Sequence, residues 1–341
     1  MDASAEPMIR LLDVSKKYAD GSLAVDQLSL DIPRGQFTVL IGPSGCGKTT
    51  TLKMINRLVE PTSGHVEVGG EDIRTVNPVE LRRQLGYVIQ HSGLFPHRTV
   101  NDNVATVLKL LRWNGDKRRA RVAEMLELVG LDPTVFGKRY PHQLSGGQRQ
   151  RVGVARALAA DPPVLLMDEP FGAVDPVQRG RLQQEFRKLQ DELQKTVVLV
   201  THDIEEAVRL GDKMAVLQEG GHLAQFDPPA WVLGDPATGF VADFVGDDRL
   251  VTRLEVATLQ DADVLPGDSR VTHYGESDIT VRVGDSLRRV LQVLMESPTG
   301  EVTVVDGSAN IGVMTPASLH QAVRRSLPEE STAQDRRDYQ H

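Results

Sequence analysis

The sequence lacks the features that mark secreted and membrane-spanning proteins. It contains a single cysteine, Cys46, so no disulfide can form within the chain and a reducing compartment is expected. It has no run of about 18 or more apolar residues, which argues against a transmembrane helix. The first residues, MDASAEPMIR, lack the basic and then apolar pattern of a signal peptide. We therefore expect a cytoplasmic protein that reaches a membrane only by docking on a partner.

Charge and composition narrow the class further. The formal net charge of -8 argues against nonspecific attraction to nucleic acid or anionic lipid as the main activity. Hydrophobic residues make up 40% of the chain and charged residues 25%, which is typical of a globular protein. A length of 341 residues leaves room for a large and a small domain. No nucleic-acid partner is expected.

Short apolar runs alternate with longer helical patterns over the first two thirds of the chain. Three of these runs have the length and composition of buried strands, at 37–41, 164–167 and 197–200. One helix is expected to begin near Lys48 and another to cover 178–195. Strand, helix and strand in this order predict a parallel α/β sheet, with functional groups at the carboxyl ends of its strands.

A glycine-rich turn follows the first of these strands. Residues 42–49 read GPSGCGKT and match the phosphate-binding pattern G-x-x-x-x-G-K-[ST]. The glycines let successive backbone N–H groups point at phosphate oxygens, and the helix start adds positive potential. Lys48 is expected to reach the β- and γ-phosphates, and the Thr49 hydroxyl to bind Mg²⁺. The residues expected to bind the nucleotide here are Gly42, Pro43, Ser44, Gly45, Cys46, Gly47, Lys48, Thr49 and Thr50.

The second strand ends in two neighbouring carboxylates, Asp168 and Glu169. Asp168, at the strand end, is placed to hold Mg²⁺ directly or through water. Glu169 points elsewhere and is the better candidate for polarising an attacking water. The third strand ends at His202 in the same fashion, where an imidazole could hydrogen-bond a γ-phosphate. Because a lone histidine at a strand end is more often structural, that role rests on family resemblance.

A second anion site is expected at 144–148, which reads LSGGQ and precedes a strong helical pattern at 149–160. A serine with two glycines at a helix start has the geometry that binds phosphate. The residues expected to bind there are Ser145, Gly146, Gly147 and Gln148.

In their order along the chain, these motifs resemble those of ABC-transporter ATPases over residues 9–246. The resemblance implies a P-loop NTPase fold, with a RecA-like core and a helical subdomain, that hydrolyses ATP with Mg²⁺. It also implies that two subunits pair head to tail, so that each ATP lies between Lys48 of one chain and Ser145 of the other.

Three further positions match residues of the same family. Tyr18 matches the aromatic residue that stacks on adenine. Gln90 matches the glutamine that joins Mg²⁺ and the attacking water to the membrane partner, and Asp175 lies in the nucleotide-site segment AVDP. The resemblance thus implies that the catalytic residues are Glu169, His202 and Gln90. It implies that the Mg²⁺ ligands are Thr49, Gln90 and Asp168.

Finer features resemble importers of quaternary amines, such as glycine betaine, choline, carnitine or proline betaine. The segments that carry this resemblance are 54–58, 86–90, 93–97 and 240–246. It implies a permease that contacts residues 91–104, an extracytoplasmic substrate-binding protein, and a place on the inner face of the membrane. Two alternatives stay open, an importer of another small solute and a soluble non-transport ABC ATPase. The latter usually has two ATPase units or a coiled-coil insertion, for which 90–144 is too short.

The C-terminal part is expected to form a small α/β domain at 250–325 that resembles a CBS module. Its pattern predicts a helix at 288–295 and strands at 302–306 and 311–313, whereas 251–281 is at best a degenerate first repeat. Residues 326–341 are polar and charged, and we expect a disordered tail. The family resemblance implies a regulatory sensor, and a small dimerising cap is an equal alternative.

Overall fold

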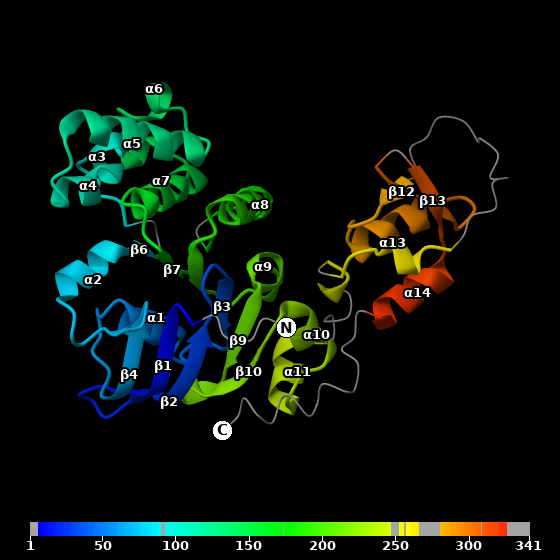
Figure 1. Ribbon diagram of the computed structural model, residues 1–341, viewed down its shortest axis with the longest axis horizontal. Coiled ribbons are helices and arrows are strands. Elements are labelled where there is room, and N and C mark those ends of the chain that lie inside the picture. The colour runs from blue at the N-terminus through cyan, green and yellow to red at the C-terminus, as the bar shows by residue number, and fades with distance from the viewer. Residues whose placement is uncertain are drawn as a thin grey trace. The chain divides into compact units, whose positions relative to one another are not determined.

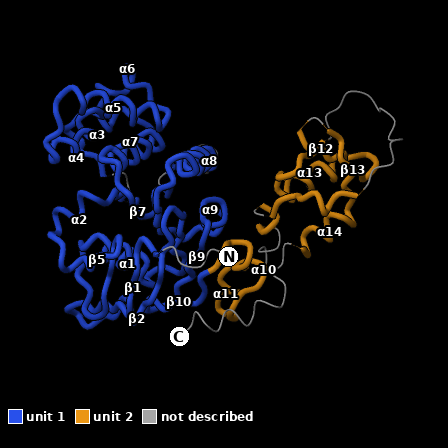
Figure 2. Tube along the Cα trace, in the orientation of Figure 1, with its two compact units in different colours: residues 1–226 blue, residues 227–341 orange. Residues whose placement is uncertain are grey.

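The computed structural model describes residues 6–89, 93–172, 174–246, 252–255, 257–265, 280–307 and 309–325. The chain divides into two compact units, residues 1–226 and 227–341 (Figure 2). Helices α10 (Pro229–Gly234) and α11 (Gly239–Val245) are grouped with the second unit, whereas the sequence predicts a first domain that runs to residue 246.

The first unit contains an antiparallel sheet in the strand order β2-β1-β4-β5 (Figure 1). Along β2, Leu28, Leu30 and Ile32 are buried and alternate with exposed residues, as a sheet with one covered face requires. β1 pairs antiparallel with both β2 and β4. The four strands are β1 (Ile9–Lys17), β2 (Leu23–Ile32), β4 (Ser63–Val68) and β5 (Glu71–Asp72).

A larger sheet follows the order β10-β9-β3-β8-β7-β6, and β3 pairs in parallel with both β9 and β8. β7 pairs in parallel with β8 and β6. Every residue of β3, β7 and β8 is buried, as expected where both faces of a sheet are covered. The three predicted strands and the parallel α/β sheet are therefore confirmed. The strands are β3 (Phe37–Ile41), β6 (Leu85–Val88), β7 (Val164–Asp168), β8 (Thr196–Val200), β9 (Lys213–Leu217) and β10 (Leu223–Asp227).

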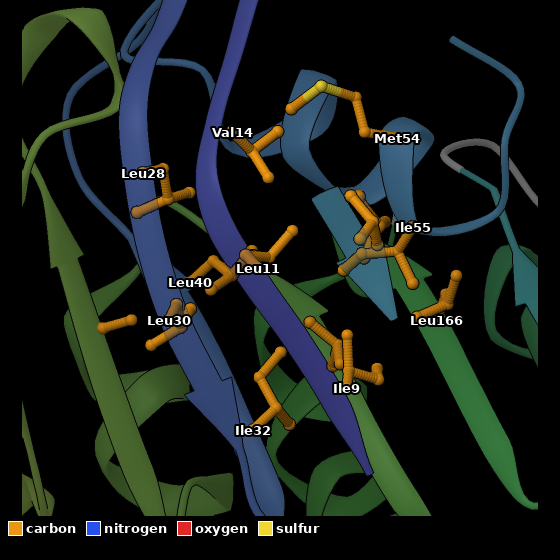
Figure 3. Packing of buried hydrophobic residues seen from close by; sticks show 14 of the residues in the cluster. Ile9, Leu11, Val14, Leu28, Leu30, Ile32, Leu40, Met54, Ile55 and Leu166 are labelled. Carbon is orange, nitrogen blue, oxygen red and sulfur yellow. The ribbon is translucent and has the colours of Figure 1, made fainter. Parts of the chain in front are cut away.

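Helix α1 (Lys48–Ile55) contacts strands of both sheets. Figure 3 shows Met54 and Ile55 of this helix in one buried apolar cluster with residues of β1 and with Leu166 of β7. Burying these side chains contributes about 1.5–3 kcal/mol each relative to exposure. The helix that follows the glycine-rich turn is thereby fixed in the core of the unit.

The remaining helices of the first unit include a group, α3 to α7, at the opposite end from the antiparallel sheet (Figure 1). Within it, α7 packs on α3 and α5. The helices of the unit besides α1 are α2 (Pro78–Gln84), α3 (Val100–Val104), α4 (Thr106–Leu110), α5 (Gly115–Leu128), α6 (Pro133–Phe136), α7 (Gly146–Leu158), α8 (Pro176–Leu193) and α9 (Ile204–Leu210).

Two helix boundaries differ from the expected ones. α8 covers 176–193 rather than 178–195, a shift within the usual uncertainty of helix ends. α7 begins at Gly146 and not at 149. Two glycines disfavour helix on propensity alone, but Ser145 and Gln148 exchange side-chain to backbone hydrogen bonds that close the first turn.

The second unit has a three-stranded sheet in the order β11-β12-β13, with β11 and β12 parallel and β12 and β13 antiparallel. The predicted helix and two strands are confirmed in this unit, whereas residues 326–341 and most of 251–281 lie outside the described part of the chain. From residue 280 onward, the helices and strands of this unit are β11 (Thr280–Arg282), α13 (Leu287–Glu296), β12 (Val302–Asp306), β13 (Ala309–Met314) and α14 (Pro316–Arg325). Among the described residues of both units, no helix has the length and apolar character needed to cross a bilayer.

Candidate functional site

The glycine-rich turn joins the carboxyl end of β3 to the start of α1 and lies tightly against its neighbours. Gly47 has φ 100°, and a Cβ there would lie 2.4 Å from the carbonyl oxygen of Ala24. At Gly45, with φ 84°, a Cβ would meet nothing within 4 Å. The turn thus has a backbone conformation that only glycine adopts easily. It packs closely against the chain at Gly47 and faces open space at Gly45. This is the cradle that a phosphate group requires.

Lys48 is buried in the turn, with 6% of its surface exposed. Its Nζ donates hydrogen bonds of 2.8 Å to the carbonyl oxygens of Gly42 and Pro43. Among the described residues no carboxylate forms an ion pair with Lys48, so its charge is left for an anion. Cys46 is fully buried in the core, and its Sγ accepts a long hydrogen bond of 3.7 Å from Nζ of Lys48. The residues present therefore fit a bound polyphosphate.

Thr49 and Asp168 meet across the turn. The Thr49 hydroxyl donates a hydrogen bond of 2.8 Å to Oδ1 of Asp168 at the end of β7. Asp168 is buried, and this burial raises the pKa of its carboxyl group above the ordinary value. Nowhere in the described chain do three His, Cys, Asp or Glu side chains gather as a metal site. A hydroxyl and one carboxylate beside a phosphate cradle fit Mg²⁺, which completes its shell with water and phosphate oxygens.

Glu169 and His202 lie at the ends of the neighbouring parallel strands β7 and β8. Nδ1 of His202 is 3.2 Å from Oε1 of Glu169. Glu169 leaves the strand with φ 44°, and its backbone N–H donates to the carbonyl oxygen of Val200. The histidine side chain is 64% exposed and the glutamate 25%, so both reach the surface beside the cradle residue Asp168. The structure therefore brings these two predicted residues together.

Glu206 is a buried carboxylate near His202 that the sequence analysis did not single out. Thr201 Oγ1 donates a hydrogen bond of 2.6 Å to Oε2 of Glu206, and Glu206 is only 5% exposed. Burial raises the pKa of Glu206 to about 7. The sequence does place an acidic residue among the apolar positions of 204–210, four residues after His202. That pattern does not show that its partner is Thr201.

The LSGGQ segment forms the start of α7. The Ser145 hydroxyl accepts from the backbone N–H of Gln148 at 3.2 Å, and the Gln148 side-chain oxygen accepts from the N–H of Ser145 at 3.0 Å. This reciprocal cap leaves other N–H groups of the first turn, including those of the two glycines, without intrahelical partners. α7 has 13 residues and thus a full helix behind this terminus. Ser145 and the two glycines therefore lie at a helix start, as expected, and anion binding there stays a prediction.

Two of the other predicted residues, Tyr18 and Asp175, lie at the surface of the first unit. The Tyr18 hydroxyl is 3.4 Å from Thr50 Oγ1 on α1, and its ring is a partly exposed surface near the cradle. Asp175 is exposed just before α8, and its carbonyl oxygen accepts from the N–H of Arg179. Gln90 lies outside the described residues. Contact of any of these residues with a nucleotide stays a prediction.

A phosphate cradle on a central parallel strand, with carboxylates at the end of a strand nearby, is the arrangement of P-loop nucleoside triphosphatases. That class is what the fold and the site define. Comparison with known proteins narrows it. Residues 25–172 match the family described as ABC transporter.

The chain is similar to ATP-binding proteins of bacterial uptake systems over most of its length. It is 48% identical to the glycine betaine/carnitine/choline transport ATP-binding protein OpuCA of Bacillus subtilis, over 88% of this chain and 76% of that one. The identity is 53% to the choline transport ATP-binding protein OpuBA of the same organism, with the same coverage. It is 45% to the osmoprotectant import ATP-binding protein OsmV of Salmonella typhimurium, again over 88% and 76%.

Among solved structures, a dimeric bacterial ABC transporter cassette superposes with a TM-score of 0.59 at 38% identity, over 65% of this chain and 99% of that one. A dimeric cassette bound to ADP and phosphate has the same TM-score at 36% identity. The chain therefore belongs to the family of ABC transporter ATPases that contains the ATP-binding subunits of osmoprotectant importers. The family and fold expected from the sequence are confirmed.

Proposed function

We propose that this chain is the ATP-hydrolysing subunit of an importer for osmoprotectant quaternary amines, such as glycine betaine, choline, carnitine or proline betaine. The observation that carries the proposal is the cluster of Lys48, Thr49, Asp168 and Glu169 in a chain similar to subunits named for these solutes. One observation favours a different small solute as the alternative. The chain is also 47% identical, over 73% of its length, to a spermidine/putrescine import ATP-binding protein of Thermobifida fusca.

ATP and Mg²⁺ are the proposed cofactors. Lys48 and the backbone N–H groups of residues 42–49 would bind the phosphates, while Thr49 and Asp168 would hold the metal. A bound Mg²⁺ supplies positive charge that stabilises the transferring phosphoryl group. The Glu169 carboxylate would orient a water and accept its proton, and His202 would hydrogen-bond the γ-phosphate. Their contact at 3.2 Å supports a shared role.

We further propose that two copies pair, so that Ser145, Gly146 and Gly147 of one copy complete the nucleotide site of the other. Two different anion-binding geometries on a single chain support this arrangement, as does the dimeric state of the similar cassettes. Tyr18, Gln148 and Asp175 would add contacts to the nucleotide or across the pair.

The remaining partners would be a membrane permease and an extracytoplasmic substrate-binding protein. The names of the relatives as transport ATP-binding proteins support a permease, which we expect to dock on residues 91–104. The chain would then work at the cytoplasmic face of the membrane. No transported solute touches this subunit in such an arrangement, so solute identity is a property of the partners.

Reconstitution tests the function directly. The chain is assembled with its permease and binding protein in proteoliposomes that contain MgATP, and uptake of labelled choline, glycine betaine and spermidine is measured. ATP-dependent uptake of either quaternary amine, lost in Lys48→Ala, is expected. Uptake of spermidine alone would assign the other solute class, and absence of MgATP hydrolysis by the wild-type chain would reject the ATPase.

The C-terminal domain proposed at 250–325 requires its own experiment. Deletion of residues 250–341 is expected to leave basal MgATP hydrolysis within about twofold and to remove its dependence on salt, if this domain is a regulatory sensor. If it is a dimerising cap, the truncated chain keeps its salt response and self-associates more weakly by sedimentation.

A further inference from the structure

The turn that carries His202 is held by a closed set of hydrogen bonds beneath it. Thr201 is 1% exposed, and its backbone N–H donates to the carbonyl oxygen of Leu40 in the central strand. Its hydroxyl donates to Glu206 Oε2 at 2.6 Å and accepts from the N–H of Asp203 at 3.1 Å. Both neighbours of His202 in sequence are therefore tied to one buried hydroxyl.

Asp203, the residue after His202, adds further hydrogen bonds to this set through its carboxylate. Its Oδ1 caps α9 by accepting from the N–H of Glu206 at 3.1 Å. Its Oδ2 lies 3.4 Å from Nη1 of Arg179, whose Nη2 donates at 3.3 Å to the carbonyl oxygen of Val174. The same bonds thus link the His202 turn to the segment that contains Asp175.

We propose that Glu206 is a positioning residue for ATP hydrolysis, which fixes the His202 imidazole against Glu169 through the hydroxyl of Thr201. The proposal rests on the hydrolytic site proposed above and extends it to a residue that touches neither nucleotide nor metal. Glu206 lies four residues from His202 on the buried side of α9, while the imidazole itself is exposed.

The His202 side chain is 64% exposed, so the buried contacts beneath its turn are needed to hold the backbone that carries it. Within the described chain, Glu169 is the partner of the His202 ring, at 3.2 Å. A single contact does not fix ring orientation, because the backbone that carries the ring could still turn. Tying Thr201 and Asp203 removes that freedom, and positioned catalytic groups depend on such supporting contacts.

The state of the Glu206 carboxyl supports a role beyond packing. Its Oε1 is buried without a hydrogen-bond partner, while Oε2 accepts from Thr201. A buried carboxyl with one orphaned oxygen is costly for stability alone. An apolar residue would fill the same space more favourably but would release the Thr201 hydroxyl.

The test compares variants of the full-length chain. Glu206→Leu should lower kcat for MgATP on the order of tenfold with KM within about twofold, because a misplaced group costs rate more than binding. Glu206→Gln retains an acceptor for the Thr201 hydroxyl and should keep kcat within about twofold. Glu205→Leu, on the exposed face of the same turn, is the matched control and should leave kcat unchanged.

A double-mutant cycle separates positioning from general destabilisation. Since Glu206 acts through His202, adding Glu206→Leu to His202→Ala should lower kcat no further. An equal fall in both backgrounds, or full activity in Glu206→Leu, would overturn the proposal. If Glu206→Leu does not fold, Thr201→Val removes the same hydrogen bond with little change of shape and must give the same result.

Resonances of the His202 ring provide a measurement that does not depend on turnover. In histidine-labelled protein they should shift in Glu206→Leu or Thr201→Val and stay in place in Glu205→Leu. Unshifted resonances would overturn the proposal. If the wild-type chain hydrolyses no MgATP, the proposed function fails instead, and the ring shifts still report on positioning.

Discussion

Thr49 Oγ1 donates a 2.8 Å hydrogen bond to Asp168 Oδ1 and so joins the first turn of α1 to the end of β7. The two residues are 119 positions apart in the chain. Lys48, the residue before Thr49, is buried, and its positive charge acts on the Asp168 carboxyl group.

Removal of that hydroxyl should weaken the metal-dependent part of nucleotide binding. In Thr49→Val we expect ATP affinity to fall on the order of tenfold with Mg²⁺ and to change little in excess chelator, since a hydrogen bond or ligand to a charged group contributes about 1.5–3 kcal/mol. Titration with a fluorescent nucleotide measures both values. Thr49→Ser keeps the hydroxyl and should behave as wild type, whereas equal losses in both metal conditions would contradict a metal ligand.

Glu169→Gln should separate binding from hydrolysis. The amide keeps the shape of the side chain but cannot accept a proton, so turnover should fall by roughly 10² or more while MgATP binding persists. The stalled chain should also accumulate as a dimer in MgATP by size-exclusion chromatography. Glu205→Gln makes the same change of charge on the exposed face of α9 and should alter neither property. Wild-type hydrolysis in Glu169→Gln would remove this residue from the mechanism.

Two glycines of the turn offer a matched comparison. A methyl group at Gly47 would lie 2.4 Å from the Ala24 carbonyl oxygen, and at Gly45 it would meet nothing within 4 Å. Both have positive φ, so each alanine should cost about 1–2 kcal/mol from backbone strain alone. Gly47→Ala should cost clearly more in free energy of unfolding and lose MgATP binding. Equal destabilisation in denaturant titrations would show that the close approach is absent.

The buried carboxyl of Glu206 predicts a pH dependence of stability. Its pKa is about 7 in the folded chain against an ordinary value of 4.5. Because the folded chain binds this proton more tightly than the unfolded chain, the carboxyl group contributes its full stabilisation below pH 4.5. That contribution to the free energy of unfolding, about 3 kcal/mol, is lost as the pH rises to 7. The wild type should lose this stability as pH rises, whereas Glu206→Gln should not. The free energy of unfolding of Glu206→Gln, relative to that of the wild type, should therefore increase by about this amount between pH 4.5 and pH 8. A constant difference across this range would contradict a raised pKa.

The sequence predicted the parts of the site that depend on local pattern. Residues 37–41 are apolar except for Thr38, and all five are buried because the strand is covered on both faces; the glycine-rich turn follows it directly. The positions of Asp168, Glu169 and His202 on one edge of the sheet were predictable for a related reason, since the carboxyl ends of parallel strands lie together there. The role of His202 came only from the family resemblance.

Contacts between distant segments were not predictable in this way. Nothing in the pattern near Thr201 indicates that its hydroxyl meets Glu206, because a buried acidic residue looks like an exposed one until its helix is placed. The link from Arg179 to Asp203 joins two helices whose packing no periodicity specifies. The early start of α7 depends on side-chain caps that outweigh glycine propensity.

The left-handed backbone of Glu169 has a consequence for how this chain tolerates change. At φ 44° a side chain bearing Cβ is held in a conformation that glycine takes without penalty. Replacing the glutamate with glycine should therefore raise the melting temperature while abolishing hydrolysis. If Glu169 activates the attacking water as proposed, thermal stability and turnover make opposite demands at this position, and selection for heat resistance alone would favour variants that do not hydrolyse ATP.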